Sequence, residues 1–315
     1  MAIGWGMLVS PETVGQIVDP ETGVSIGCGS VLSRPGFGAA MDNSDCFAGA
    51  LNDCSPEISG EHYTSNLILR RVSRGKPSVL VKNLPFQPPE TLQHFGISSL
   101  VANVLCREHN SRLSGFDTEG GKLFAALDDI DQQVSTGGAG DSAYEVNGDM
   151  VERWLLKTLI GSLFSGNLRL PDGRAKSVRP PDEYLDMLFR TGEFPAGCGL
   201  YLTAARPNQV LKGSPTVFTM EAEPSAEGNV IGLHVGMFGF DFFLALVPVP
   251  DPRPKHLADA TYRPTGLLFV TNTGRKEIRF QWKAGSGQVV GVRHVGTDHA
   301  TREELGIPDN PKRRR

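Results

Sequence analysis

Four side chains in the first third of the chain have the types and spacing of a metal site. Cys106 and His109 form a Cys-x-x-His pair, which supplies half of the four ligands that zinc usually takes. Cys46 and Cys54 lie upstream and would complete a closed Cys3His site, which is a structural kind of site. The seven residues between Cys46 and Cys54 exceed the usual two to four, and Cys28 is an alternative ligand. Ordinary free thiols at Cys46 and Cys54 are the competing interpretation.

A second group of side chains beside these ligands has the donors of a catalytic metal site. Glu61 and His62 follow the upstream cysteines, and Asn110 follows His109 directly. If Cys106 opens a helix, successive residues point about 100° apart, so Asn110 faces away from the zinc and toward the segment that carries His62. A neutral imidazole is a suitable base for water, and Glu and Asn oxygens suit Mg²⁺. Alternatively, His62 packs against a hairpin and Asn110 caps a turn.

The stretch that follows His62 carries only positive charge. Between Tyr63 and Pro89 there is no acidic residue. The basic residues of this stretch are Arg70, Arg71, Arg74, Lys76 and Lys82. Local positive charge beside a candidate active site favours phosphate binding, which supplies most non-specific affinity for nucleic acid. We therefore predict that Arg70, Arg71, Arg74 and Lys76 contact nucleic acid, with a solvated helix or hairpin face as the alternative.

The whole segment from Cys46 to Asn110 resembles the HNH endonuclease superfamily, which has a ββα-metal, treble-clef fold. It looks most like the branch in which Glu-His replaces Asp-His and Asn replaces the final His. The resemblance covers roughly residues 45–115 and implies that His62 is the general base. It also implies that Glu61 and Asn110 bind a catalytic Mg²⁺ or Mn²⁺ ion. The structural zinc ligands that the resemblance implies are Cys46, Cys54, Cys106 and His109.

The same segment departs from the HNH pattern in two places. The family often has Pro shortly after its first His and a Gly pair further on, where this chain has Tyr63-Thr64-Ser65 and Leu69-Arg70-Arg71. Asn103 is in the region of the middle Asn of the motif, and Asn83 matches it less well. These departures bear on activity more than on fold, so a catalytically inactive zinc-stabilised binding module is the second hypothesis.

Composition limits the classes of protein to consider. The 315 residues are enough for roughly two domains, and the net charge of −4 means that attraction to nucleic acid must be local. Five cysteines are an odd number, which argues against a disulfide framework and favours a reduced, cytoplasmic protein. The first residues lack the features of a signal peptide, and no run approaches the roughly 20 apolar residues of a membrane span. The sequence does not indicate an oligomeric state.

The order of local patterns predicts an α+β protein with a small zinc-held module in front. The glycine-rich stretch Val134–Gly140 is the best linker. The predicted parts are an irregular segment (1–40), an HNH-like zinc-binding module (41–133), an α+β domain with a mostly antiparallel sheet (145–300) and a basic tail (301–315).

Helices and strands are predicted from capping pairs and periodicity. Ser114 with Asp117, and Asp149 with Glu152, have the spacing of capping pairs and predict the starts of two helices. A third helix is predicted from Asp182 to Arg190. Alternating patterns predict strands at 216–223, 238–245, 266–272, 278–282 and 288–295.

The rear half offers no recognisable chemistry. Its histidines, His234, His256, His294 and His299, have no metal-ligand spacing, and His234 reads as a core histidine in an apolar strand. Cys198 reads as a small buried thiol. A third hypothesis places the function of the protein wholly in this half.

Overall fold

The computed structural model describes residues 2–5, 44–88, 91–168, 179–204, 218–226, 228–271, 274–283 and 289–293. The predicted irregular segment is outside these residues except for 2–5, and Cys28, His294, His299 and the basic tail are also outside them. None of the described helices is both long enough and apolar enough to cross a membrane.

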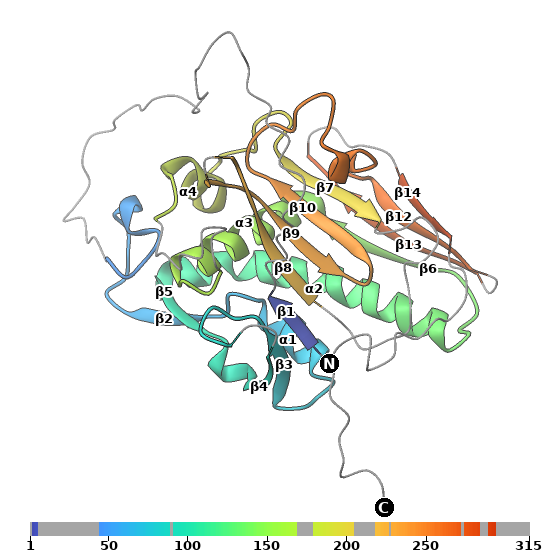
Figure 1. Ribbon diagram of the computed structural model, residues 1–315, viewed down its shortest axis with the longest axis horizontal. Coiled ribbons are helices and arrows are strands. Elements are labelled where there is room, and N and C mark those ends of the chain that lie inside the picture. Colours follow the sequence, from blue (N-terminus) through green and yellow to red (C-terminus); the bar gives the residue numbers. More distant parts are fainter. Residues whose placement is uncertain are drawn as a thin grey trace, which may run out of the picture.

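The described residues form a mixed α+β structure with three sheets (Figure 1). The α-helices are α1 (Asn66–Val72), α2 (Arg107–Ser135), α3 (Gly148–Phe164) and α4 (Asp182–Phe189). Short 3-10 turns are η1 (Gly49–Leu51), η2 (Ile97–Ser99) and η3 (Lys255–Leu257). The first strands are β1 (Ala2–Trp5), β2 (Ile58–Glu61), β3 (Ser78–Lys82), β4 (Leu92–Gly96), β5 (Ala102–Cys106) and β6 (Ser142–Asn147). The later strands are β7 (Gly199–Ala204), β8 (Phe218–Pro224), β9 (Val230–Met237), β10 (Phe240–Ala245), β11 (Thr261–Tyr262), β12 (Gly266–Thr271), β13 (Gly274–Gln281) and β14 (Val289–Arg293).

The largest sheet has the strand order β11-β7-β10-β9-β8-β1-β3-β4. Its strands pair antiparallel except that β1 is parallel to both β3 and β8. The second sheet, β14-β12-β13-β6, is mixed, because β12–β13 is antiparallel and the other two pairs are parallel. Strands β2 and β5 form a separate antiparallel pair, from which α2 continues directly. The predicted mostly antiparallel sheet of the rear half is thus joined to strands of the front half.

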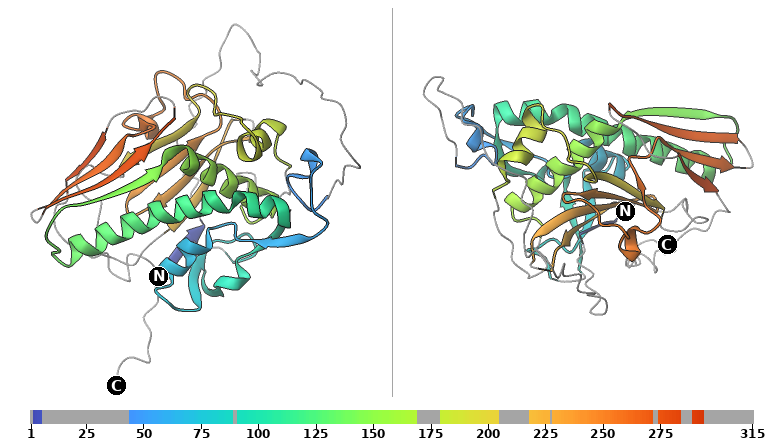
Figure 2. Two further views of the ribbon diagram at one scale, coloured as in Figure 1. Left: turned by 180° about the vertical axis from the view of Figure 1, so that it is seen from behind. Right: turned by 90° about the horizontal axis from the view of Figure 1, so that it is seen from above.

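The helices form a layer against one face of the largest sheet, as the view from above in Figure 2 shows. Phe124 of α2 contacts Phe218 of β8 across this interface, with ring centroids 6.3 Å apart. Two glycines in the middle of α2 allow its neighbours to approach closely. A Cβ atom on Gly120 would lie 2.3 Å from the ring of Trp154 on α3, and one on Gly121 would lie 2.8 Å from Leu67 on α1. The helix propensity lost at each glycine, about 1 kcal/mol, is offset by this packing.

A single cluster of buried apolar side chains runs from Cys46 to Phe280 and includes residues from both halves of the chain. The predicted linker does lie between α2 and β6. However, β6 pairs with β13, and α2 packs against α3, so the elements on either side of the linker share one core.

Most of the predicted elements are present, with three corrections. The first predicted helix is α2, but it starts at Arg107 and not at the Ser114–Asp117 pair, because the side chain of Cys106 caps it. Likewise Asn147, not Asp149, caps α3 through its side chain. Phe238 was expected inside a strand, but with a φ of 53° it lies in the turn that joins β9 to β10.

Candidate functional site

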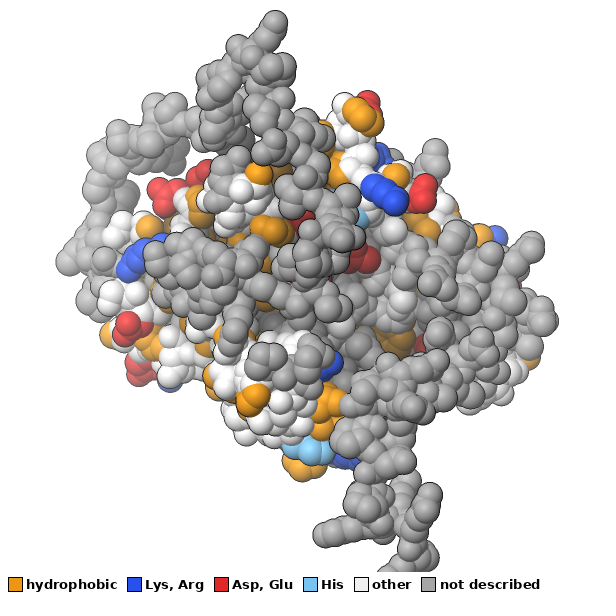
Figure 3. Space-filling model, viewed as in Figure 1, with side chains coloured by type: hydrophobic (Ala, Val, Ile, Leu, Met, Phe, Trp, Pro, Cys, Tyr) orange, Lys and Arg blue, Asp and Glu red, His pale blue; other side chains and the backbone are white. Residues whose placement is uncertain are grey.

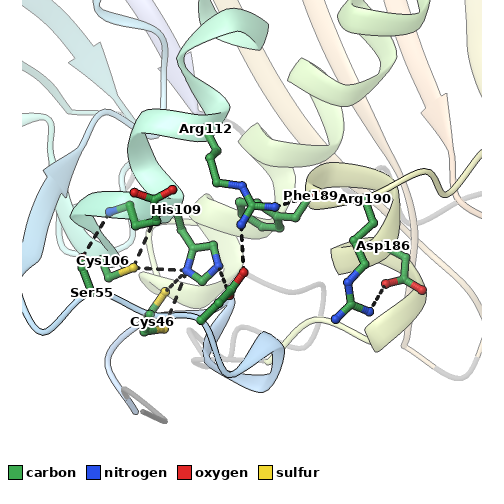
Figure 4. Close-up of polar contacts among 11 residues, drawn as sticks. Cys46, Ser55, Cys106, His109, Arg112, Asp186, Phe189 and Arg190 are labelled. Atoms are coloured by element: carbon green, nitrogen blue, oxygen red, sulfur yellow. Dashed lines mark hydrogen bonds and ion pairs between the residues drawn. The ribbon is translucent and has the colours of Figure 1, made fainter. Parts of the chain in front are cut away.

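Cys46, Cys54, Cys106 and His109 come together in a buried cluster (Figure 4). Their ligand atoms all lie within 4.8 Å of one another. The His109 Nδ1 atom lies 3.5 Å from Cys46 Sγ, 3.7 Å from Cys54 Sγ and 3.1 Å from Cys106 Sγ. With Zn–S near 2.3 Å and Zn–N near 2.0 Å, a tetrahedral site separates sulfur from nitrogen by about 3.5 Å. The cluster could hold a metal ion, and both its donors and its spacing suit a tetrahedral one.

The long spacing between Cys46 and Cys54 is accommodated by η1. The Gly49 N–H donates to the Cys46 carbonyl at 2.9 Å, which closes a tight turn directly after the first cysteine. Asn52 then adopts a left-handed conformation with a φ of 60°, so the chain reverses toward Cys54. The backbone N–H of Phe47 donates to the Val104 carbonyl at 2.9 Å and ties this loop to β5. The intervening residues thus form an ordered turn that brings both thiols to α2.

Cys106 has two roles at the start of α2. Its sulfur accepts the backbone N–H of His109 at 3.5 Å, so the thiol caps the helix in the position that Ser or Asp often takes. The Glu108 N–H donates to Ser55 Oγ at 3.2 Å, so a second backbone N–H of the first turn also has a partner. The Cys-x-x-His pair thus lies at the start of α2, and the ligand spacing places His109 toward the thiols.

The sequence did not indicate the residues that fix the His109 ring. Asp53 Oδ1 lies 2.7 Å from His109 Nε2, and Asp53 Oδ2 lies 3.0 Å from Arg112 Nη1. The ring of Phe189 on α4 lies edge-on to His109, with centroids 4.8 Å apart. A carboxylate that accepts a hydrogen bond from one ring nitrogen of a histidine commonly directs the other ring nitrogen toward a metal. The adjacency of Asp53 to Cys54 was a weak signal for this role, whereas Phe189 is too distant in sequence to be recognised.

The ionisation of the ligands also suits metal binding. Burial lowers the pKa of His109, which favours the neutral imidazole that a metal requires. Burial raises the pKa of Cys46 to about 12, so this thiol stays protonated at neutral pH unless a metal displaces the proton. At Cys106, burial raises the pKa, but hydrogen bonds from the backbone of His109 and from Ser55 outweigh burial and lower it. A helix N-terminus favours the thiolate in the same way.

The end of β2 carries a second polar cluster. Lys157 of α3 is 3% exposed and forms ion pairs with both Glu61 and Asp117. A register irregularity between Ser59 and Glu61 turns Glu61 toward these partners. Burial raises the pKa of Glu61 to about 7, although the nearby Lys157 ammonium opposes this shift. The sequence gave no indication of Lys157, and it assigned Asp117 only to a helix cap.

His62 and Asn110 both lie at this end of β2. Burial lowers the pKa of His62, and the charges of Asp117, Lys157 and Arg70 are close enough to influence it. The His62 Nε2 atom is buried and has no hydrogen-bond partner among the described residues. The Asn110 side chain donates from Nδ2 to Ser59 Oγ at 2.9 Å and to the Gly60 carbonyl at 3.5 Å. Glu61 and His62 thus lie at the end of β2, and the Asn110 side chain contacts Ser59 and Gly60 of the same strand.

Comparisons of the chain with known protein families, curated proteins and solved structures found no match.

The predicted nucleic-acid-binding residues divide into two kinds. Arg71 forms ion pairs with Asp128, at 2.9 Å, and with Asp129, and Arg74 Nη1 lies 2.7 Å from the same Asp128. These arginines are held by carboxylates of α2, so a phosphate would compete with Asp128 for them. Arg70 and Lys76 are exposed. On the face shown in Figure 3, the blue side chains of the described Lys and Arg residues are scattered and do not form one patch.

Proposed function

We propose that the protein is a metal-dependent, HNH-type endonuclease that hydrolyses phosphodiester bonds of nucleic acid. The observation that carries the proposal is the joint placement of two sites on one ββα arrangement. Strands β2 and β5 pair antiparallel, α2 follows β5 directly, and the Cys3His cluster lies at the base of this unit. Glu61 ends β2 and His62 follows it directly, beside α2, which carries Asn110.

In this proposal the cluster of Cys46, Cys54, Cys106 and His109 holds a structural Zn²⁺ ion. All four positions of a tetrahedral ion are filled by protein atoms, so no position remains for water or substrate. The ion would hold η1 and the start of α2 in place, and thereby position Asn110 against β2.

His62 is the general base in this mechanism. Its lowered pKa keeps the ring neutral at pH 7, and Nε2 has no hydrogen-bond partner among the described residues to compete for the lone pair. Nε2 takes a proton from water, the resulting hydroxide attacks phosphorus, and the bond to the leaving oxygen breaks. Glu61 and the Asn110 side-chain oxygen would hold a Mg²⁺ or Mn²⁺ ion, which would stabilise the charge on the phosphate and the leaving oxygen.

Lys157 supports a second candidate function. Its ammonium contacts Glu61 Oε1 and so provides a fixed positive charge at the carboxylate assigned to the metal. A divalent ion at Glu61 has to share this carboxylate with Lys157. If Lys157 replaces the ion permanently, the unit is a zinc-stabilised nucleic-acid-binding module without cleavage activity.

The decisive test is cleavage of plasmid and single-stranded substrates with Mg²⁺ or Mn²⁺ added or omitted. We expect metal-dependent cleavage by the wild type and a loss of about 10²- to 10⁴-fold in rate for His62→Ala, the typical contribution of a general base. The exposed His94 on β4 provides the matched control, and His94→Ala should retain full activity. Equal rates for wild type and His62→Ala would refute the mechanism. Absence of cleavage with binding retained would support the inactive module.

Nucleic-acid affinity is expected to depend on Arg70 and Lys76, which are exposed. Replacing Arg70 and Lys76 together with alanine should reduce the slope of log affinity against log salt by about 0.9 for each lost phosphate contact on duplex DNA. The charge-matched control is Arg275→Ala with Arg279→Ala on β13, where both side chains are exposed and lie close to Glu277. Equal slopes in the two double variants would show that the stretch is only a solvated surface. Fluorescence anisotropy over a salt series measures these slopes.

A further inference from the structure

A second group of metal-ligand side chains lies on the largest sheet, apart from the Cys3His cluster. Glu223 is on β8, His234 is on β9, and His256 is in η3, and one donor atom of each lies within 4.8 Å of the others. His234 Nε2 is 3.4 Å from Glu223 Oε2, and His256 Nε2 is 3.9 Å from Glu223 Oε1. The sequence showed no metal spacing here because strand pairing and a loop, not a local motif, bring the three together.

The sheet and the η3 loop hold these three residues in place. His234 is directly opposite Glu221 on β8, so Glu223 is its diagonal neighbour two residues along. Phe243 lies beneath both imidazoles: its ring stacks on His234 with centroids 4.4 Å apart and meets His256 edge-on at 6.4 Å. Gly232 leaves room for this ring, since a Cβ atom there would lie 2.3 Å from Phe243. Leu257, which follows His256, is buried in a small apolar cluster with Phe243 and fixes the loop.

Asp241 orients His234 for a ligand role. Its Oδ2 atom lies 2.7 Å from His234 Nδ1, which leaves Nε2 directed at Glu223. A carboxylate on the second nitrogen is the arrangement found at most metal-binding histidines. Glu223 and Asp241 thus place two carboxylate groups beside the His234 ring, and their negative charge favours a cation there.

We propose that Glu223, His234 and His256 form a second, open site for a divalent transition-metal ion, with Asp241 as the group that orients His234. Two imidazoles and one carboxylate are a donor set that suits Zn²⁺, Fe²⁺, Co²⁺ or Ni²⁺. Three protein ligands leave coordination positions free. The side chains of His256 and Glu223 are 48% and 29% exposed, so an ion and a further ligand can reach the site from solvent. In contrast to the closed Cys3His cluster, this site has room for water or an anion on the metal.

The site is tested by adding Co²⁺ to the purified full-length protein that retains its tightly bound metal. We expect visible d–d absorption without the near-ultraviolet thiolate-to-cobalt bands that a cysteine site produces. Calorimetric titration should show this additional binding event in the wild type and not in His256→Ala. Asp241→Asn should retain the site with affinity reduced by about 10- to 100-fold.

Two controls separate this site from other causes of binding. His256 is exposed, so His256→Ala should fold normally, which circular dichroism verifies. His94→Ala removes another exposed histidine and should leave the titration unchanged. Identical Co²⁺ titrations of wild type and His256→Ala, or no additional binding to the wild type, would show that the cluster is only an ion-paired histidine between two carboxylates.

Discussion

Replacing Cys106 with serine is expected to release the metal of the Cys3His cluster and to unfold the segment around it. The substitution removes a ligand of the cluster, whereas a serine hydroxyl can still accept the His109 N–H and cap α2, so the expected loss is that of the metal ligand. Structural zinc contributes about 10–16 kcal/mol of apparent binding free energy in small zinc domains, and this energy is available only to the folded state. We therefore expect elemental analysis to find no zinc in purified Cys106→Ser. We also expect a large decrease in its melting temperature.

Cys198 provides a matched control for this experiment. It is also a buried cysteine, but its thiol donates to the Leu246 carbonyl at 3.6 Å and does not belong to the cluster. Cys198→Ser should keep one tightly bound zinc per chain. Full zinc content in Cys106→Ser, or a stable wild type that contains no zinc, would overturn the assignment of the cluster as a structural zinc site.

Replacing Lys157 with methionine is expected to destabilise the protein by about 3–5 kcal/mol, the usual result of removing one partner from a buried ion pair. Methionine preserves much of the volume, so the loss comes chiefly from charge. Glu61 and Asp117 share the single positive charge of Lys157, and its removal takes away the cation that both carboxylates contact. Urea denaturation of wild type and variant measures the difference in unfolding free energy, provided that the free energy depends on urea concentration with the same slope in both proteins.

Two further variants test whether the loss of stability comes from the buried charge of Lys157. Lys122→Met removes a lysine that is 57% exposed and paired with Glu119, and it should cost about 0.5 kcal/mol. Adding Glu61→Gln and Asp117→Asn to Lys157→Met should recover most of the lost stability, since no buried charge then remains unpaired. A Lys157→Met variant as stable as Lys122→Met would mean that the ion pairs contribute little in solution.

The parts of the candidate site that could be predicted are those encoded by local spacing. Cys-x-x-His at the start of a helix places a thiol and an imidazole on one side of the first turn, and this placement does not depend on the rest of the sequence. Apolar periodicity likewise indicated α2, α3 and α4, and alternation indicated most strands of the rear half. The start of α2 was misplaced because cysteine was not considered as a capping residue, whereas Ser114 and Asp117 have the familiar spacing.

The parts that could not be predicted depend on contacts between distant segments. Lys157 reaches Glu61 only because α3 packs against α2, and nothing near Lys157 in sequence indicates this partner. Similarly, Arg71 appeared to be free because its partner Asp128 lies far along the chain. His234 and His256 meet through strand register and a loop, neither of which a single sequence specifies.

If the Cys3His cluster holds a metal ion, the position of its four ligands early in the chain has a consequence for protein synthesis. All four ligands of the Cys3His cluster have been made once residue 109 has left the ribosome, but β6 must wait for β13, which ends at Gln281. At about 5–20 residues per second, this interval lasts about 10 to 35 s. A nascent chain that has bound its metal can hold the start of α2 folded during that time. One without metal exposes the apolar side of α2 to chaperones, proteases and other nascent chains, so the supply of metal at translation should determine the yield of folded protein.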